Sequence, residues 1–386
     1  MKIVCDQRIP FVDEAFGHFG QIVKCDSRAI DSTIVKDADA LLVRSETKVD
    51  EKLIGGSKVR FVGTATIGTD HVEHEFLKRH GITFASAPGC NSWAVVQYIF
   101  SAIFTLAGKH GFKLKDKKLG VVGVGNIGSK IVSVAEKMGI EVAQNDPPRF
   151  RKTGDNRFVN LDGLMDSDII TIHVPYTRAG TDPTHHLFGA ERLARMKKGS
   201  IIINSSRGAV IDNQALKAAL GNGTPGMAVL DVWEKEPNID IELLPKCEIG
   251  TQHIAGYSID GKMNATSMIY NAFCGYFGFD RSWNSTSVIA PPDEPVIRMK
   301  SSFSDSESAI SEVVRRCYDI TKDDARLRQI ADIQPEDRGR YFKELRGKYK
   351  FRYEFSNMTV EIPKPDRYLE EVLRSFRFNV RTETNP

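Results

Sequence analysis

The sequence predicts an α/β protein with two doubly wound parallel-sheet domains and a small C-terminal α+β domain. Three observations support this prediction. Short apolar runs alternate with polar helical stretches over about the first hundred residues, a second alternating series begins at Lys118, and charged residues become dense after a proline-rich segment at 290–295. Such alternation is typical of βαβ units, whose strands pair in parallel. A chain of 386 residues is long enough for two or three domains.

The first alternating series contains short apolar runs that predict strands at 3–4, 22–23, 40–43 and 59–63. A longer, mostly apolar stretch at 91–106 predicts a helix. Helical patterns rather than tight turns separate the runs, so we expect the strands to be parallel.

The second series predicts five strands, at 119–122, 141–144, 169–173, 200–204 and 227–230. Helical patterns lie between them, most clearly at 130–138 and 213–220, and a further one covers 258–277. This order of elements is typical of a doubly wound sheet with helices on both faces.

The segment after the prolines predicts the small α+β domain. Apolar residues recur at helical spacing in two stretches, which are Ile310, Val313, Val314 and Cys317, and then Tyr368, Leu369, Val372, Leu373 and Phe376. Between these stretches, aromatic residues alternate with Arg352 and Glu354 over 351–355, and this alternation predicts a half-buried strand.

Composition and charge narrow the possible functions. The net charge is +3 and the charges of both signs are interspersed, so we expect no nucleic-acid or membrane partner. No apolar run approaches the ~20 residues that span a bilayer, and the N-terminal residues predict a strand rather than a secretory signal. Six scattered cysteines, never in CxxC pairs, favour reduced thiols in a cytoplasmic protein and predict no metal site: Cys5, Cys25, Cys90, Cys247, Cys274 and Cys317.

A glycine-rich motif of the form GxGxxG follows the strand predicted at 119–122. In a strand–turn–helix context, the first glycine permits the tight turn and the second lets a pyrophosphate approach the backbone. The third allows close packing of helix against strand. These residues therefore predict a dinucleotide site: Gly123, Gly125, Asn126, Ile127 and Gly128.

Asp146 follows the next predicted strand and indicates which dinucleotide binds. An acidic residue at this point can accept a hydrogen bond from a ribose 2′-hydroxyl and repels a 2′-phosphate, which favours NAD over NADP. The alternative is an ordinary glycine turn beside a solvated aspartate.

Three later residues form a set suited to oxidising an alcohol: Arg207, Glu236 and His253. An arginine after a parallel strand can hold a substrate carboxylate through two N–H groups. Hydride loss from a secondary alcohol requires a base for the hydroxyl proton, and histidine titrates near neutral pH. A carboxylate beside the imidazole would orient it and stabilise its charged form. Taken singly, the three residues are also compatible with a solvated loop, a turn before proline and a structural histidine.

Together these motifs resemble the D-2-hydroxyacid dehydrogenase family. The matching segments occur in the family's order, at 121–128, 173–175, 196–199, 204–210, 230–237 and 252–256. The resemblance implies that NAD is the cofactor and that Arg207, Glu236 and His253 are catalytic. It also implies that further residues line the cofactor, namely Val174, Ser205, Ser206, Arg207, Asp231 and Gly256.

The resemblance further implies how the domains are connected. In that family a nucleotide-binding domain is inserted into a substrate-binding domain that is built from both flanking segments. We therefore expect a Rossmann-like NAD-binding domain at 96–253, a substrate-binding domain at 1–95 and 254–288, and a C-terminal domain at 289–386 that makes a homodimer.

Further motifs resemble the branch of the family that acts on a four-carbon phosphorylated acid. They lie at 43–47, 63–71, 87–91 and 184–188, followed by the C-terminal domain. The resemblance implies oxidation of the 2-hydroxyl of 4-phospho-D-erythronate to the 2-oxo acid in vitamin B6 biosynthesis. Ser45, Thr66 and Tyr257 would contact this substrate.

The substrate phosphate would need cations. Arg44, beside Ser45, is the first candidate. A basic stretch is the second, although a solvated helix face is its alternative: Arg338, Arg340, Lys343, Arg346, Lys348, Lys350 and Arg352.

Two other functions stay open. The first is another D-2-hydroxyacid dehydrogenase such as 3-phosphoglycerate dehydrogenase, although the C-terminal segment does not clearly predict a βαββαβ regulatory unit. The second is an NAD-sensing corepressor, which would bind protein partners with little turnover; the lack of long disordered tails weighs against it. An assay with NAD and the phosphorylated acid would separate these functions.

Overall fold

The computed structural model describes residues 1–284, 289–300, 303 and 305–382. The chain divides into two compact units, each made from two segments. Unit 1 contains Met1–Ser92 and Tyr257–Ala290, and unit 2 contains Trp93–Gly256 together with the chain from Pro291 onward. Each unit is built around its own parallel sheet.

Unit 1 contains a five-stranded parallel sheet with the order β2-β1-β3-β4-β5. The direction of the strand order changes between β1 and β3, and ligands of such sheets bind at the carboxyl ends of the strands beside this point. The strands are β1 (Lys2–Asp6), β2 (Gln21–Cys25), β3 (Ala40–Val43), β4 (Phe61–Thr64) and β5 (Thr83–Ala85). The helices are α1 (Val12–Phe16), α2 (Ser32–Val35), α3 (Glu51–Ile54), α4 (His74–Arg79) and α10 (Ile259–Phe277).

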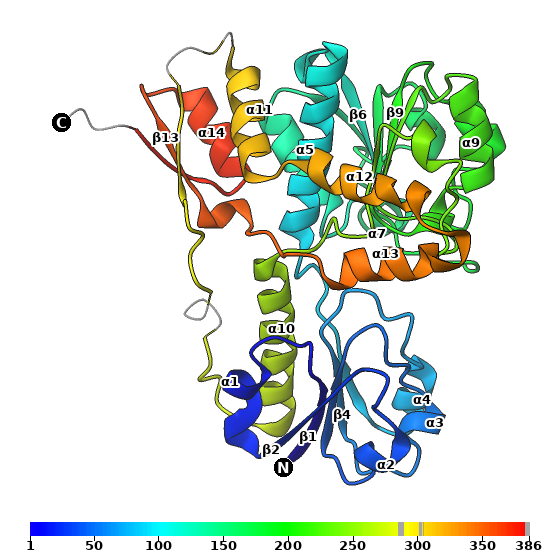
Figure 1. The fold of residues 1–386 in the computed structure, drawn as a ribbon, viewed down its shortest axis with the longest axis vertical. Coiled ribbons are helices and arrows are strands. Elements are labelled where there is room, and N and C mark those ends of the chain that lie inside the picture. The colour runs from blue at the N-terminus through cyan, green and yellow to red at the C-terminus, as the bar shows by residue number, and fades with distance from the viewer. Residues whose placement is uncertain (285–288, 301–302, 304, 383–386) are drawn as a thin grey trace. The chain divides into compact units, whose positions relative to one another are not determined.

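Different helices cover the two faces of this sheet (Figure 1). On one face α10 buries Ile269 and Phe273 against Leu42 and Phe61 of the strands. On the other face α2, α3 and α4 bury their own apolar residues, including Phe76. Because α10 belongs to the second segment of unit 1, this packing joins the two segments into one core.

Unit 2 contains a six-stranded parallel sheet with the order β11-β10-β9-β8-β6-β7. An isolated parallel bridge between Gln144 and Phe158 extends it beyond β7. With this bridge, the order 3-2-1-4-5-6 of dinucleotide-binding folds is present, and β6 is its first strand. The strands are β6 (Lys118–Val122), β7 (Glu141–Asn145), β8 (Ile169–Ile172), β9 (Ile201–Asn204), β10 (Met227–Leu230) and β11 (Ile249–Gly250).

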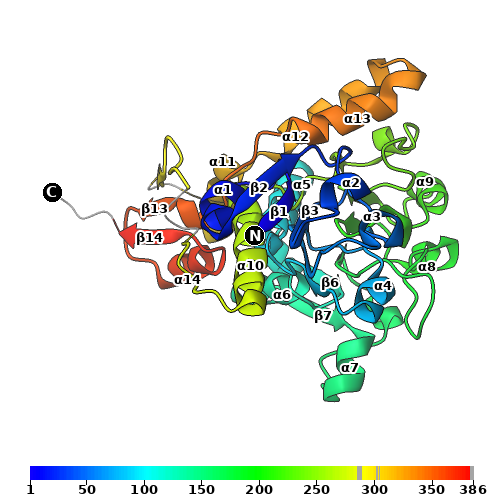
Figure 2. The same cartoon turned by 90° about the horizontal axis from the view of Figure 1, so that it is seen from below.

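The helices along residues 92–221 connect these strands or precede them. They are α5 (Ser92–His110), α6 (Gly128–Lys137), α7 (Pro147–Thr153), α8 (Ala190–Arg195) and α9 (Asn213–Gly221). Figure 2 shows α8 and α9 together at one end of the unit, and they pack against each other.

The chain from Pro291 has a sheet of its own, the parallel sheet β12-β13-β14. The strands of this segment are β12 (Val296–Arg298), β13 (Thr359–Ile362) and β14 (Asn379–Thr382). Its helices are α11 (Ser306–Cys317), α12 (Ile320–Arg328), α13 (Arg338–Gly347) and α14 (Arg367–Ser375).

This terminal segment packs on the rest of unit 2 in two places. The paired helices α12 and α13, visible in Figures 1 and 2, bury Leu327 and Phe342 in the same core as the six-stranded sheet. At the other place, the ring of Phe376 contacts Phe100 of α5 edge-on. These shared cores explain why the segment groups with Trp93–Gly256. The predicted domain boundaries stay a prediction, and the one at 288 adjoins 285–288, outside the described residues.

The predicted fold class is confirmed by the two large parallel sheets and the separate C-terminal sheet. The runs at 40–43 and 227–230 coincide with β3 and β10. The sequence pattern does not predict β5 and β11, which are three and two residues long, because strands so short show no periodicity.

The strand predicted at 351–355 is wrong. A 3-10 helix begins at Phe355, and β13 begins only at Thr359. The alternation is misleading because its charged members do not face solvent. Glu354 is 1% exposed, and Arg352 donates hydrogen bonds to backbone carbonyls.

Among the described residues, no helix combines the length and the apolar character that crossing a bilayer would require.

Candidate active site

The residues predicted for the site fall into two sets, one in each unit. The glycine motif, Asp146 and the three predicted catalytic residues lie in unit 2, whereas Arg44, Ser45, Thr66 and Tyr257 lie in unit 1. Gly256 is the last residue of its segment of unit 2. Each set is described within its own unit.

The glycine motif lies between β6 and α6, and its geometry explains the choice of glycine. Gly123 has a φ of +84°, and a Cβ there would lie 2.6 Å from the carbonyl oxygen of His173. A Cβ on Gly128 would lie 2.0 Å from the carbonyl oxygen of Gly123. A Cβ on Gly125 would meet no atom within 4 Å, so the backbone there is open to a ligand. The turn, the open approach and the close packing match the three roles of a dinucleotide-binding motif.

Asp146 follows β7 and its carboxylate is tied to the glycine motif. One oxygen accepts a hydrogen bond from the backbone N–H of Val124 at 2.9 Å, and the other accepts one from Arg149 N–H at 3.0 Å. The guanidinium of Arg149 donates to the carbonyl oxygen of Val124. Asp146 is therefore held beside the loop that is predicted to bind the pyrophosphate, where a ribose would follow.

The loop after β9 also fits a nucleotide. The Oδ1 of Asn204 accepts hydrogen bonds from the N–H and hydroxyl of Ser206, and its amide donates to the carbonyl of Arg207. The hydroxyl of Ser205 is buried without a hydrogen-bond partner among the described residues. A buried orphan hydroxyl at the carboxyl edge of the sheet that also carries the open glycine loop fits a bound polar ligand such as NAD.

Glu236 and His253 form the hydrogen-bonded pair that the sequence analysis expects. The Nδ1 of His253 lies 2.8 Å from the Oε2 of Glu236, and the other carboxylate oxygen accepts the N–H of Trp233 at 2.8 Å. Burial alone would raise the pKa of Glu236, but the charge and hydrogen bond of His253, with smaller contributions from the N–H of Trp233 and the charge of Arg346, lower it overall. A carboxylate that stays ionised beside an imidazole fixes the ring and its tautomer.

The backbone that carries His253 is strained and is held firmly. His253 has a φ of +61°, in the left-handed region that side-chain-bearing residues rarely adopt. Its N–H donates to the carbonyl of Asp231, and the Asp231 carboxylate accepts the N–H groups of Ile254 and Ala255 at 2.7 and 2.9 Å. The same carboxylate accepts the hydroxyl of Thr251 at 2.6 Å. Such strain persists only where the surroundings over-determine the conformation.

Asp231 therefore has a role that the resemblance does not imply. The family resemblance implies that Asp231 lines the cofactor, whereas its oxygens accept hydrogen bonds from the segment at 251–255. It is 1% exposed, and burial raises its pKa. A cofactor contact for Asp231 stays a prediction.

The loops that carry Arg207 and Glu236 touch through their backbones. A Cβ on Gly208 would lie 2.0 Å from the carbonyl carbon and oxygen of Trp233. Trp233 in turn donates its indole N–H to the carbonyl of Thr251 at 2.9 Å. The loops after β9, β10 and β11 are thus packed together at the carboxyl edge of the sheet, so the three predicted catalytic residues lie on contacting loops.

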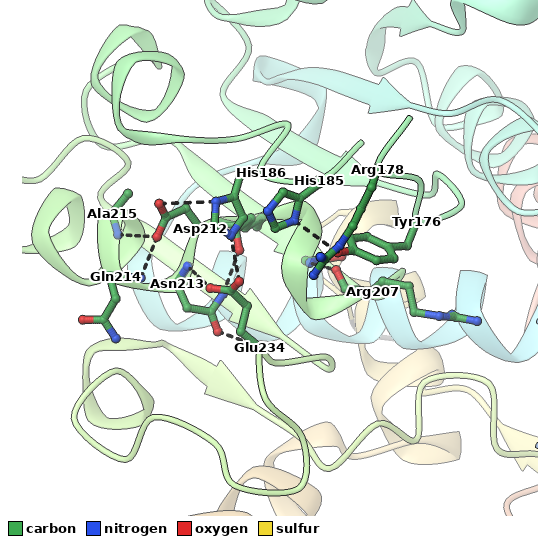
Figure 3. A network of polar contacts seen from close by, with 12 residues as sticks. Tyr176, Arg178, His185, His186, Arg207, Asp212, Asn213, Gln214, Ala215 and Glu234 are labelled. Carbon is green, nitrogen blue, oxygen red and sulfur yellow. Dashed lines mark hydrogen bonds and ion pairs between the residues drawn. The ribbon is translucent and has the colours of Figure 1, made fainter. Parts of the chain in front are cut away.

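The sequence analysis missed a network that supports the Glu236 loop (Figure 3). In this network His186 lies between two acidic residues. Its Nε2 is 2.7 Å from a carboxylate oxygen of Glu234, and its Nδ1 is 3.6 Å from a carboxylate oxygen of Asp212. The other Glu234 oxygen accepts the N–H of Asn213, whose side-chain oxygen accepts the N–H of Glu234. Asp212 caps α9. His186 appeared in the sequence only as part of the motif at 184–188.

The network also bears on the prediction that no metal binds. Among the described residues, His186, Asp212 and Glu234 form the group of histidine and acidic side chains whose ligand atoms lie within 4.8 Å of one another. These atoms already pair with each other, with Asn213 and with the start of α9. The absence of a metal stays a prediction.

In unit 1, three of the predicted substrate residues follow adjacent strands β3 and β4. Arg44 and Ser45 come directly after β3, where Ser45 is exposed. Thr66 follows β4, and its hydroxyl lies 2.8 Å from that of Thr64 and donates to the carbonyl of Gly68. Carboxyl ends of neighbouring parallel strands meet at one edge, so these residues share the edge where such sheets bind ligands.

Lys262 of α10 is a further cation in unit 1 that the sequence analysis missed. Burial, together with the positive charges of Arg44 and Arg8, lowers its pKa to about 7, while the charge of Asp6 opposes them. The action of two arginine charges on one lysine indicates a positive cluster. The motifs gave no signal for Lys262 because it occupies an ordinary position in a helix.

The second phosphate candidate, the basic stretch, does not act as one surface. The guanidinium of Arg352 faces inward to backbone carbonyls, and the charge of Arg346 is among those that lower the pKa of Glu236. The Nε of Arg346 is also buried, so these two members are not part of a fully solvated helix face.

Comparison with known families supports the sequence analysis. Residues 102–255 match the family described as D-isomer specific 2-hydroxyacid dehydrogenase, NAD binding domain. Residues 289–374 match a family described as a domain of unknown function.

Curated relatives match nearly the whole chain. A protein of Azotobacter vinelandii named erythronate-4-phosphate dehydrogenase is 42% identical over 377 residues, which is 97% of this chain and 98% of the relative. Proteins of the same name from Salinibacter ruber and Cronobacter sakazakii are 42% and 39% identical over 93% and 98% of this chain, and over 94% and 98% of their own lengths.

Solved structures share the fold of a smaller part. D-lactate dehydrogenase of Aquifex aeolicus, complexed with NAD and lactic acid, has a TM-score of 0.58 and 24% identity, covering 72% of this chain and 96% of that chain. NAD-bound 3-phosphoglycerate dehydrogenase of Entamoeba histolytica has a TM-score of 0.59 and 25% identity, covering 72% and 95%. The matches cover nearly all of both solved structures but leave over a quarter of this chain unmatched.

Proposed function

The chain belongs to the erythronate-4-phosphate dehydrogenase family of D-isomer specific 2-hydroxyacid dehydrogenases, and from this membership we propose that it oxidises 4-phospho-D-erythronate with NAD. The product is 2-oxo-3-hydroxy-4-phosphobutanoate, an intermediate of pyridoxal phosphate biosynthesis. The observation that carries the proposed mechanism is the 2.8 Å hydrogen bond between His253 and Glu236.

His253 is the proposed base. Because Glu236 accepts the hydrogen bond of Nδ1, the imidazole keeps its proton there and offers Nε2 to the 2-hydroxyl of the substrate. The hydroxyl proton passes to Nε2, and Glu236 stabilises the imidazolium that forms. NAD, when bound, supplies the acceptor for the hydride that leaves C2. Arg207 holds the substrate carboxylate through its guanidinium.

The cofactor is held by the remaining residues of the unit 2 set. The backbone around Gly125 is open to the pyrophosphate, and Asp146 lies beside it for a ribose hydroxyl. Ser205 offers its buried hydroxyl. Asn126, Ile127, Val174, Ser206, Asp231 and Gly256 complete the proposed set.

Turnover of the purified protein with 4-phospho-D-erythronate and NAD tests this function, with an oxo-acid acceptor added to re-oxidise tightly held cofactor. His253→Asn should lower kcat by ~10²–10⁴-fold, the typical contribution of a positioned base. His110→Asn is the matched control, because it breaks another histidine–glutamate pair of unit 2, with Glu248. Full activity of His253→Asn would refute the mechanism.

The same experiment separates the remaining alternatives. A preference for 3-phosphoglycerate over the four-carbon acid would identify the other dehydrogenase. NAD binding without turnover on either acid would favour the corepressor. We favour the four-carbon substrate because relatives named for it match nearly the whole chain, including the C-terminal segment.

The substrate phosphate is proposed to bind the positive cluster of unit 1. Arg44 remains the first candidate, and Lys262 is added because the charges of Arg44 and Arg8 act on it and, with its burial, lower its pKa to about 7. A bound phosphate dianion would offset their repulsion and raise the pKa of Lys262. Ser45, Thr66 and Tyr257 would bind the rest of the substrate.

Proton uptake on substrate binding tests the proposed phosphate site directly. At pH ~8, where a lysine of lowered pKa is largely neutral, substrate binding should take up a proton, and calorimetry in buffers of different ionisation enthalpy measures it. Lys262→Met should abolish the uptake and raise KM by ~10-fold or more, as expected for a lost ionic hydrogen bond. Lys322→Met, at an exposed helix position, is the control. Unchanged uptake in Lys262→Met would exclude that residue.

The oligomeric state and the cellular compartment of the protein are also proposals. We propose a homodimer formed through the C-terminal domain, which light scattering on the full chain would test. All six cysteines are free thiols. This fits a reducing compartment, so we propose the cytoplasm, which fractionation of cells would test.

A further inference from the structure

We propose that Arg352, far along the chain in the C-terminal segment, is a positioning residue that holds the catalytic histidine His253 in its reactive conformation. Arg352 acts through the backbone that follows His253 and not through the substrate. The inference rests on the proposed function, since it assumes that His253 is the base.

The contacts of Arg352 are with backbone carbonyls. Its Nη1 donates to the carbonyl of Ile254 at 3.2 Å, and its Nη2 donates to the carbonyls of Ala255 and Ala94 at 2.5 and 2.9 Å. Ile254 and Ala255 are the two residues directly after His253. One guanidinium therefore links this segment to the start of α5.

Asp231 binds the same two residues, Ile254 and Ala255, through their backbone N–H groups. Its carboxylate accepts the N–H groups of Ile254 and Ala255, while Arg352 donates to their carbonyls. An anion thus holds the donors of these peptide units and a cation holds the acceptors. Charged groups form the stronger hydrogen bonds of this kind. This double grip accounts for how His253 keeps a φ of +61°.

Arg352 is itself fixed in place. Its guanidinium lies over the ring of Tyr318, 4.2 Å from the centroid. The hydroxyls of Tyr318 and Tyr349 both donate to Asp323, which is 3% exposed. These residues all belong to the C-terminal segment, so the segment supplies a preorganised cation to the catalytic loop.

The contacts of Arg352 join two parts of the chain that match different families. The stretch that matches the NAD-binding domain of the dehydrogenase family, 102–255, contains Glu236, His253 and the six-stranded sheet. Arg352 lies in the stretch 289–374, which matches a separate family. In this chain, the terminal segment adds a second hold on the histidine loop.

The test compares two arginines that clamp backbone carbonyls. Arg328 donates to the carbonyls of Leu244 and Cys247, on a stretch that carries none of the proposed site residues. Arg352→Met should lower kcat by ~10–100-fold, the cost of a misplaced catalytic group, with unchanged KM for NAD. Arg328→Met should lower Tm but leave kcat near that of the wild type.

An isotope effect separates positioning from simple destabilisation. With substrate deuterated at C2, the isotope effect on kcat should be larger in Arg352→Met than in the wild type, because the chemical step becomes slower than product release. Arg328→Met should keep the wild-type isotope effect. A merely less stable enzyme would lose active molecules without changing this ratio.

Several outcomes would overturn the inference. These are a kcat of Arg352→Met equal to that of Arg328→Met, or an unchanged isotope effect. If Arg352→Met does not fold, Arg352→Lys decides, because it keeps the charge but not the planar fork. A folded Arg352→Lys with reduced kcat supports the inference, and one with wild-type kcat refutes it. Lack of turnover in the wild type, or full activity in His253→Asn, would instead refute the proposed function.

Discussion

The two loops that carry the proposed catalytic pair are held in different ways. The loop with Glu236 is fixed by hydrogen bonds from His186 and Asn213, both within the nucleotide-binding part of the chain. The segment after His253 is held by Asp231 and, through Arg352, by the C-terminal segment. Nearly a hundred residues separate Arg352 from His253, whereas the supports of the Glu236 loop lie nearer in sequence and belong to one sheet.

This difference separates the support that comes from the matched NAD-binding domain from the support that the C-terminal segment adds. Support of Glu236 comes from the loops after β8 and β9, which belong to the same sheet as β10. The C-terminal segment also reaches this loop, where a Cβ on Gly339 would lie 2.3 Å from Asn238. That approach is packing, however, while at His253 the segment supplies hydrogen bonds from a charged group. We expect the two loops to respond differently to mutation.

The largest loss of kcat should come from breaking the pair of Glu236 and His253 itself. Glu236→Gln keeps the shape of the side chain but removes the charge that stabilises the imidazolium, so kcat should fall by ~10²–10⁴-fold. KM for NAD should change little, because the glycine motif is untouched. Steady-state kinetics measures both. A kcat near that of the wild type would mean that His253 needs no carboxylate.

A smaller effect should come from separating the loops after β9 and β10. Gly208→Ala places a Cβ against the backbone of Trp233, where the structure leaves only 2.0 Å. We expect a loss of ~1–3 kcal/mol in the free energy of unfolding, typical of overpacking, together with reduced kcat. Gly221→Ala is the control, because a Cβ at this end of α9 meets no atom within 4 Å and φ is not positive there. Equal stability of the two variants in urea would contradict the close approach.

The local support of Glu236 should matter less than Arg352. His186→Gln removes the hydrogen bond to Glu234, two residues before Glu236, and we expect a fall in kcat of roughly tenfold from the looser loop. His185→Gln is the neighbouring control, because it keeps the hydrogen bond between His186 and Glu234 while it removes the contact of His185 with Tyr176 and its stacking on the ring of His186. A larger loss in His186→Gln than in Arg352→Met would reverse the comparison between the loops.

The smallest effect concerns stability in acid. The pKa of Glu236 in the folded protein lies below its ordinary value of 4.5. Its ionised form therefore stabilises the fold above pH 4.5, and this contribution disappears as the pH falls through the lowered pKa. Urea unfolding of wild type and Glu236→Gln should differ most near neutral pH and converge in acid. A difference that grows in acid would mean that His253 does not lower the pKa.

Much of the fold and half of the site follow from local patterns in the sequence. Alternating apolar runs determine both large sheets, because strand and helix periodicities are local properties. The glycine motif predicts its own turn, since Gly123 and Gly128 leave no room for a Cβ. The family resemblance named Arg207, Glu236 and His253, and the structure adds the hydrogen bond between the last two.

The support of the site was decided only by the tertiary structure. Arg352 gave the signal of an outward-facing residue on a strand, yet it turns inward to the carbonyls after His253. Lys262 and His186 gave no signal of their own either. Their roles depend on charges and hydrogen-bonding groups that come from distant segments. The sequence by itself thus determined which groups perform the chemistry, while folding decided what holds them, because a hydrogen bond between distant segments leaves no periodicity in either.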